Sequence, residues 1–183
     1  MPNYRRNYVP GGTYFFTVVT YKRRPLFHDE VIRGLFREAI QHVQAKLPFE
    51  MFASVLLPEH FHCIWTLPHE DANYSRRWRQ IKEKFTYLFL RSGHRGLERS
   101  ASQKRHREQA IWQRRFWEHT VRDVDDLERC TNYIHWNPVK HNLAQRVKDW
   151  QWSSFHRFVQ AGDYPLDWGS ADPCPGYHSP EWE

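Results

Sequence analysis

The chain has 183 residues, 40% of them hydrophobic, which is enough for one sizeable core and short for two. Its net charge of +6 favours a polyanionic partner such as nucleic acid, although 21 acidic residues accompany the 27 basic ones. The cysteines Cys63, Cys130 and Cys174 lack paired spacing, which argues against a disulfide framework, and no apolar run approaches the roughly 20 residues of a membrane span, so we expect a protein of a reducing cytoplasm.

The first half of the chain predicts strands and helices from short-range patterns. Residues rich in β-branched and aromatic side chains indicate strands, and apolar residues at a 3.6-residue period indicate amphipathic helices. The expected elements are a strand over 13–20, a helix capped by Asp29 that ends before Pro48, a hairpin of strands over 49–57 and 60–67, and a helix over 75–91.

The second half is less regular, and one polar and basic stretch predicts a mobile loop. The expected elements are this loop over 92–109, a strand over 111–121, a helix over 123–137, a short capped helix over 150–162 and an extended tail from 163. Proline inside a regular helix costs about 3 kcal/mol, so Pro138 predicts that the third helix ends at Asn137 and leaves its amide free.

This order of elements predicts an α+β fold of the ferredoxin-like type. Strand, helix, strand, strand, helix, strand is the split βαβ arrangement, with an antiparallel sheet and the two helices on one face. The helix over 123–137 is then an addition to that arrangement.

Two pairs of polar residues carry the functional hypothesis. His60 and His62 have strand spacing, so both imidazoles leave the same face of the sheet and lie close enough to share a cation. Tyr133 and Asn137 have helix spacing, one turn apart. If that helix packs on the histidine face, a phenol and an amide oxygen both reach the two imidazoles.

The histidine pair alone is weak evidence, because twelve histidines in 183 residues produce about one such pair by chance. The alternative is a pair of surface or hydrogen-bonded core histidines. Against it, the pair begins a strand directly after a turn, where substrate can reach it. The opposite face of that strand is wholly apolar and fixes the side that the imidazoles take: Phe61, Cys63, Trp65 and Leu67.

For Tyr133 the ordinary alternative is stronger, since a tyrosine on an amphipathic helix is usually a half-buried packing residue with a solvated hydroxyl. Its position on the flank of the expected buried stripe would suit a reactive phenol. The residues of that stripe are Val124, Leu127, Thr131 and Ile134.

Two imidazoles and an amide oxygen, with room for phosphate oxygens, suit Mg²⁺ or Mn²⁺ better than a closed zinc site. With a reference pKa of about 10, a phenol must lose its proton when it attacks phosphorus, and a nearby cation assists that loss. Phosphoryl transfer to tyrosine conserves the bond energy, so rejoining the DNA needs no nucleotide triphosphate. In agreement, the chain has no P-loop motif for binding one.

Four ordered blocks of the chain resemble a known family. LPEHFHCIWTLP resembles the HUH signature, and RRFWEHTVRD, YIHWNPVKHNL and WQWSSFHRF resemble blocks of the REP-associated tyrosine transposases, single-tyrosine relatives of the insertion-sequence-200-like transposases. The resemblance covers about residues 4–162. Glu59 stands where relatives often carry Asn, Cys63 where they often carry Leu, and Asn137 where many carry Gln.

The resemblance implies an enzyme that cuts and joins single-stranded DNA containing short palindromic hairpins. It implies that His60, His62 and Asn137 hold the divalent metal and that Tyr133 is the nucleophile of a 5′-phosphotyrosine intermediate. It also implies a catalytic domain over 1–149, followed by a C-terminal helix and tail over 150–183. We expect a monomer or homodimer without a membrane partner, associated with the bacterial nucleoid.

Clustered basic residues are the expected contacts to DNA phosphates, although a solvated loop that only keeps the protein soluble explains any one of them. They are Arg5, Arg6, Arg76, Arg77, Lys104, Arg105 and Arg107. The charge and the aromatic residues also fit a non-catalytic nucleic-acid-binding module on a ferredoxin-like sheet. Such a module does not explain why His60, His62, Tyr133 and Asn137 occur together.

Overall fold

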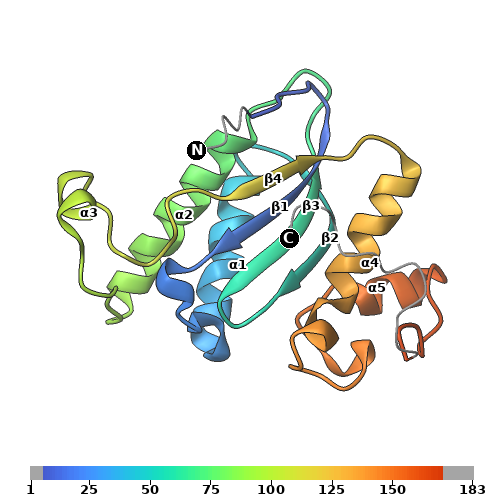
Figure 1. The fold of residues 1–183 in the computed structure, drawn as a ribbon. Helices are drawn as coiled ribbons and strands as arrows, with labels where there is room; N and C mark the ends of the chain where they lie inside the picture. Colours follow the sequence, from blue (N-terminus) through green and yellow to red (C-terminus); the bar gives the residue numbers. More distant parts are fainter. Residues whose placement is uncertain (1–5, 171–183) are drawn as a thin grey trace.

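The computed structural model of the protein describes residues 6–170 (Figure 1). Short 3₁₀ turns over 21–23, 26–28 and 147–149 accompany the main elements. These are β1 (Thr13–Val19), α1 (Glu30–Gln44), β2 (Glu50–Leu56), β3 (His60–Thr66), α2 (Tyr74–Arg91), α3 (Ala101–Arg105), β4 (Trp117–Thr120), α4 (Val124–Lys140) and α5 (Phe155–Ala161).

The strands form one four-stranded sheet in the order β2-β3-β1-β4, and all neighbours are antiparallel. This is the strand order of the ferredoxin-like arrangement, so the predicted fold class is confirmed. The register pairs Thr17 of β1 with His62 of β3. Paired residues of neighbouring strands point to the same face, and Thr17 therefore lies beside the histidine.

Helices α1 and α2 cover one face of the sheet, and α4 covers the other (Figure 1). Side chains of adjacent residues alternate between these layers, so Phe16 packs with the α1 and α2 side and Phe15 packs with the α4 side. The α1 and α2 layer is rich in aromatic rings, with Trp65 stacked on Trp78 at a centroid distance of 4.4 Å. The expected addition of a third helix to the ferredoxin-like unit is confirmed.

Aspartates cap α1 and α4, two of the helices that cover the sheet. The carboxylate of Asp29 accepts hydrogen bonds from the backbone N–H groups of Val31 and Ile32, at 2.7 and 3.3 Å, and so begins α1. Asp123 accepts a bond of 2.8 Å from the N–H of Asp126 at the start of α4. These bonds satisfy donors that have no partner inside the helix.

The predicted end of the third helix at Asn137 is wrong, because α4 runs through Pro138 to Lys140. A proline removes one hydrogen bond of the helix, but Pro138 lies in the last turn, where few bonds remain to be lost. The backbone N–H of His141 bonds to the carbonyl of Asn137 at 3.0 Å and closes the helix. Asn137 therefore lies inside the helix and is not free to bend away from it.

The stretch from Ser92 to Gln109 contains a short helix, α3, where the sequence analysis predicts only a mobile loop. A capping box begins this helix, since Ser100 and Gln103 each bond to the other's backbone N–H. These two hydrogen bonds stabilise the start of a helix whose sequence has no apolar residues at a 3.6-residue period. A pattern search for buried faces therefore overlooks the helix.

The predicted strand over 111–121 is too long. Only β4 pairs regularly with β1, and upstream a single bridge joins Trp112 to Thr20. Ala110 has a positive φ of 51°, which interrupts extended backbone just before this stretch. Alternating side chains alone do not reveal where a strand leaves the sheet.

The chain after α4 packs back on the sheet and on α4. Ser153 forms a bridge with Val55, and the N–H of Leu56 bonds to the carbonyl of Trp152 at 2.8 Å. These contacts cross the expected domain boundary after residue 149. Tyr164 and Trp168 pack in a cluster with α4 and α5, so residues 163–170 do not form the extended tail that the composition predicts. The remainder of that tail, with Cys174, lies outside the described residues.

Between residues 6 and 170, the structure contains no helix with the length and apolar character needed to cross a membrane.

Candidate active site

The two histidines begin β3 and face α4. Their side chains are nearly buried, each with 3% of its surface exposed, and the ring centroids lie 4.7 Å apart. Both imidazoles leave the same face of the sheet, as strand spacing predicts. One ion could therefore reach both rings.

A hydrogen bond at Nδ1 holds each imidazole. Thr17 Oγ1 lies 2.8 Å from Nδ1 of His62, and Glu59 Oε1 lies 3.0 Å from Nδ1 of His60. A histidine that binds metal through one nitrogen usually has its other nitrogen bonded in this way, which fixes the ring. The hydrogen bond from His60 also holds the pKa of Glu59 below its usual value. The Nε2 atoms are therefore the ones left to bind an ion.

Nε2 of His62 is buried and has no hydrogen-bond partner among the described residues. Burial, and then the nearby charges of His60, His141 and Lys140, hold the pKa of His62 well below its usual range. The ring is therefore neutral at neutral pH. Neutral imidazole is the form that binds a metal ion.

Tyr133 approaches the histidines from α4. Its ring centroid lies 5.3 Å from that of His62 and 5.7 Å from that of Phe15, and the side chain is 2% exposed. The ammonium group of Lys140 lies 5.1 Å from the centre of the phenol ring.

The placement of Tyr133 on the flank of the helix's buried stripe is wrong. Val124, expected in that stripe, is 78% exposed, whereas Tyr133 and Asn137 lie on the buried face with Ile134. Within the first turn, Val124 lies on the exposed side of the helix, whereas Asp126 is buried and bonds to His119 of β4.

Asn137 follows Tyr133 by one helical turn and is fully buried. Neither the oxygen nor the nitrogen of its carboxamide has a hydrogen-bond partner among the described residues. One turn further, the ring of His141 lies 5.4 Å from that of His60. Asn137 thus lies on α4 between two residues that contact the histidine pair. Buried amides normally have partners, so this one indicates a ligand.

The donor groups of the histidine pair and of Asn137 fit a divalent ion. They offer neutral imidazole nitrogens from His60 and His62 and an amide oxygen from Asn137, and two of these three residues have buried polar atoms without a partner. Such a mixed set of nitrogen and oxygen donors, with places left for phosphate oxygens, suits Mg²⁺ or Mn²⁺.

Four neighbours of this site were missed by sequence reasoning: Thr17, Glu59, Lys140 and His141. Glu59 precedes His60 directly, and this adjacency was the available signal. His141 continues the spacing of Tyr133 and Asn137 by one more turn, but the expected helix end at Pro138 hid it. Thr17 becomes visible only with the register of β1 and β3.

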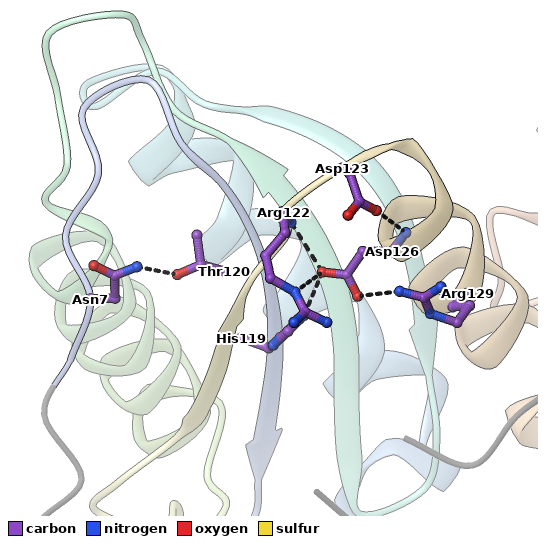
Figure 2. A network of polar contacts seen from close by, with 7 residues as sticks. All are labelled: Asn7, His119, Thr120, Arg122, Asp123, Asp126 and Arg129. Carbon is purple, nitrogen blue, oxygen red and sulfur yellow. Dashed lines mark hydrogen bonds and ion pairs between the residues drawn. The ribbon is translucent and has the colours of Figure 1, made fainter. Parts of the chain in front are cut away.

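A second group of side chains that could hold a metal lies between β4 and α4. Ligand atoms of His119, Asp126 and Cys130 lie within 4.8 Å of one another. Figure 2 shows that the Asp126 carboxylate already receives bonds from His119 at 2.8 Å and from Arg122 and Arg129. Burial raises the pKa of Cys130 to about 12, which keeps the thiol protonated. The group therefore serves as an ion-pair network that fastens α4 to β4.

Arg77 is not available to DNA, contrary to its prediction as a phosphate contact. Its guanidinium is 1% exposed, forms an ion pair of 2.9 Å with Asp71, and donates to the backbone carbonyls of Leu47, Pro48 and Asn73. A charge pattern does not distinguish a surface arginine from a buried one that donates to backbone carbonyls.

The other predicted phosphate contacts differ in exposure. Arg76, Lys104, Arg105 and Arg107 are exposed, and Arg5 lies outside the described residues. Arg6 is partly buried, bonds to Ser75 and lies 3.8 Å from Glu118. The exposed group on and after α3 lies at the opposite end of the molecule from α4 (Figure 1).

Comparisons with known proteins show similarity over most of the chain. Residues 8–137 match the family model described as "Transposase IS200 like". The chain is 45% identical over 168 residues to the REP-associated tyrosine transposase of Escherichia coli (strain K12), which covers 92% of this chain and 91% of that protein. A Haemophilus influenzae relative is 43% identical over 169 residues, which cover 92% of this chain and 94% of the relative.

The fold is similar to the solved structure of a REP-associated tyrosine transposase bound to a REP hairpin. The TM-score is 0.78 with 42% sequence identity, and the match covers 94% of each chain.

Proposed function

The chain belongs to the IS200-like transposase family, and from this premise we propose that it is a metal-dependent single-strand DNA endonuclease and strand transferase acting on REP-type hairpins. The single observation that carries this proposal is the contact of Tyr133 with His62 of the buried histidine pair. The buried amide of Asn137, which has no partner among the described residues, lies one helical turn from Tyr133. Its place of action would be the DNA of the bacterial nucleoid.

His60, His62 and Asn137 are the proposed ligands of one Mg²⁺ or Mn²⁺ ion. When bound, such an ion supplies Lewis-acid polarisation of the phosphate to be cut. Glu59 and Thr17 orient the two imidazoles through their Nδ1 atoms and so keep both Nε2 atoms directed to the site.

Tyr133 is the proposed nucleophile. Its phenolic oxygen attacks phosphorus, the bond from phosphorus to the 3′ oxygen breaks, and the DNA is left with a free 3′ end and a 5′-phosphotyrosine. The phenol loses its proton in this step and the departing 3′ oxygen gains one, while the ammonium group of Lys140 lies 5.1 Å from the centre of the phenol ring.

Rejoining reverses the same chemistry. A 3′ hydroxyl attacks the phosphotyrosine, the bond to tyrosine breaks, and the energy comes from the aryl phosphodiester itself. One tyrosine per chain holds one DNA end at a time. Two linked cuts therefore need either two turnovers of a monomer or both chains of a homodimer.

A denaturing gel tests the proposal. Hairpin DNA labelled at its 3′ end is incubated with the protein and Mn²⁺, and the expected product is a labelled band of protein covalently joined to DNA. Addition of a chelator should remove this band. Tight DNA binding without any covalent band, at several metal concentrations, would instead support the non-catalytic binding module.

A further inference from the structure

A thiol that the ion-pair network does not use lies beside that network, between β4 and α4. Cys130 follows Asp126 by one helical turn, and ligand atoms of these two residues and of His119 lie within 4.8 Å of one another. The Cys130 side chain is 4% exposed and makes no hydrogen bond to any of residues 6–170. A buried thiol, a carboxylate and an imidazole are therefore brought together here.

Regular elements of the fold hold all three side chains. His119 lies in β4, Asp126 in the first turn of α4 and Cys130 in the next turn. Ligand atoms around one tetrahedral zinc ion lie roughly 3.5 Å apart. Small side-chain rotations bring the three atoms to that spacing, because none of them lies more than 4.8 Å from another. Water would fill the fourth position of the ion.

The cations that hold Asp126 can be replaced. Arg122 lies 3.3 Å and Arg129 lies 3.5 Å from its carboxylate oxygens, and the two side chains are 70% and 44% exposed (Figure 2). Both arginines are therefore able to turn into solvent when a divalent ion arrives. With a thiolate, a carboxylate and a neutral imidazole as ligands, such an ion leaves the buried site without net charge.

We propose that His119, Asp126 and Cys130 bind one Zn²⁺ ion, at a site separate from the candidate active site. A thiolate ligand selects zinc over Mg²⁺ and Mn²⁺, which prefer oxygen. On binding, the S–H bond of Cys130 breaks, a bond from sulfur to zinc forms, and the proton passes to solvent. The site needs neither the metal proposed for cleavage nor Tyr133.

Zinc at this position would hold the turn of α4 that leads to Tyr133. Cys130 packs in the same cluster as Tyr133, Ile134 and Phe15. An ion that binds only the folded chain stabilises that chain by mass action. We therefore expect Zn²⁺ to raise the melting temperature of the wild-type protein and to leave that of Cys130→Ala unchanged.

Co²⁺ tests the site, because it binds in place of zinc and its bond to sulfur absorbs light. Metal-free wild-type protein is titrated with Co²⁺, and we expect a thiolate-to-cobalt charge-transfer band in the near ultraviolet. The candidate active site does not produce this band, because its donors are nitrogen and oxygen. Cys130→Ala should lose the band, and Cys63→Ala, a matched control at another buried cysteine, should keep it.

His119→Gln is a second variant, at a less buried position whose side chain is 19% exposed. It should weaken Co²⁺ binding by at least about 100-fold, because loss of a residue that only orients a ligand already costs about 10- to 100-fold. Cooperative thermal unfolding of each metal-free variant shows that the variant is folded.

The inference is overturned if the wild-type protein gives no sulfur band, or if Cys130→Ala keeps the band. Calorimetry with Zn²⁺ on the His60→Ala/His62→Ala double variant separates it from the proposed function, since one equivalent should still bind. Loss of all zinc binding in that variant refutes the second site alone. An absent covalent band on the denaturing gel refutes the transposase chemistry alone.

Discussion

The imidazole of His62 and the phenol of Tyr133 pack edge to face, with ring centroids 5.3 Å apart and an angle of 78° between the planes. The contact joins β3 to α4, two elements that lie far apart in the sequence. It places the proposed nucleophile directly beside a proposed metal ligand. The ring of Tyr133 therefore packs against the site through contacts that do not involve its hydroxyl.

Tyr133→Phe should abolish the covalent adduct and leave DNA affinity nearly unchanged, because the ring contacts with His62 and Phe15 remain. The denaturing gel measures the adduct, and anisotropy measures affinity. Tyr87→Phe is the matched control, since Tyr87 is exposed on α2, and it should retain full activity. A persistent adduct in the Tyr133 variant would show that another residue attacks the DNA.

His60→Ala or His62→Ala should remove divalent-metal binding together with activity, and Asn137→Ala should cause a smaller loss, because a neutral amide is the weakest of the three ligands. Glu59→Ala should weaken Mn²⁺ binding by about 10- to 100-fold, because its carboxylate only orients His60. Titration calorimetry with Mn²⁺ measures the metal affinity of all four variants. Wild-type metal affinity in the double histidine variant would end the metal-site hypothesis.

Arg77→Gln should lower the free energy of unfolding by about 2 to 4 kcal/mol, because the buried guanidinium no longer pairs with Asp71 or donates to three backbone carbonyls. Arg76→Gln, at the exposed neighbouring position, should change it by no more than about 0.5 kcal/mol. Urea unfolding measures both. Similar values for the two variants would contradict the structural role of Arg77.

Neutralising Lys104, Arg105 and Arg107 together should flatten the salt dependence of DNA binding. Each true phosphate contact that is lost lowers the slope of log affinity against log salt by about 0.7 to 0.9. The base preference next to the hairpin should stay the same, since phosphate contacts carry no sequence information. An unchanged slope would mean that this segment does not touch DNA phosphates.

His135 should make the protein less stable in acid. Burial, with a smaller effect of the Arg157 charge, lowers the pKa of His135 to about 3, whereas the unfolded side chain titrates at the ordinary value of about 6.5. Between these values the unfolded state binds the extra proton, so stability falls as the pH falls, by about 1.4 kcal/mol per pH unit, and is unaffected above about pH 7.

Urea unfolding of the wild type and of His135→Gln at pH 7, 5 and 4 measures this effect. Glutamine can still bond to Ser154, which lies 2.8 Å from Nε2 of His135, but it does not titrate. The difference in free energy of unfolding between the two proteins should change by about 1.4 kcal/mol per pH unit over this acid range. A constant difference would show that His135 is not held neutral by the fold.

Much of the fold follows from short-range patterns. Period, caps and turns place every strand and each of the longer helices near its observed position, and their order specifies the sheet. The errors concern features that depend on the assembled structure. Pro138 is tolerated because the helix ends a few residues later, and residues 111–116 leave the sheet although their side chains alternate as in a strand.

Sequence spacing predicted those parts of the candidate site that lie on a single strand or a single helix. Strand and helix periods place His60 with His62, and Tyr133 with Asn137. The partners of these residues were not predictable in the same way, because Thr17 depends on strand register and His141 on the continuation of α4 past Pro138. The burial of Arg77 depends on carbonyls of a distant loop, which no charge pattern shows.

The network around Asp126 has a consequence for the kinetics of cleavage. It ties the start of α4 to His119 of β4 in the same chain (Figure 2), while Tyr133 contacts His62 of that chain further along the helix. The proposed nucleophile thus lies beside a proposed metal ligand of its own chain. The rate of a single cut should therefore rise in proportion to protein concentration, with a reaction order of one and no lag for assembly of a second copy.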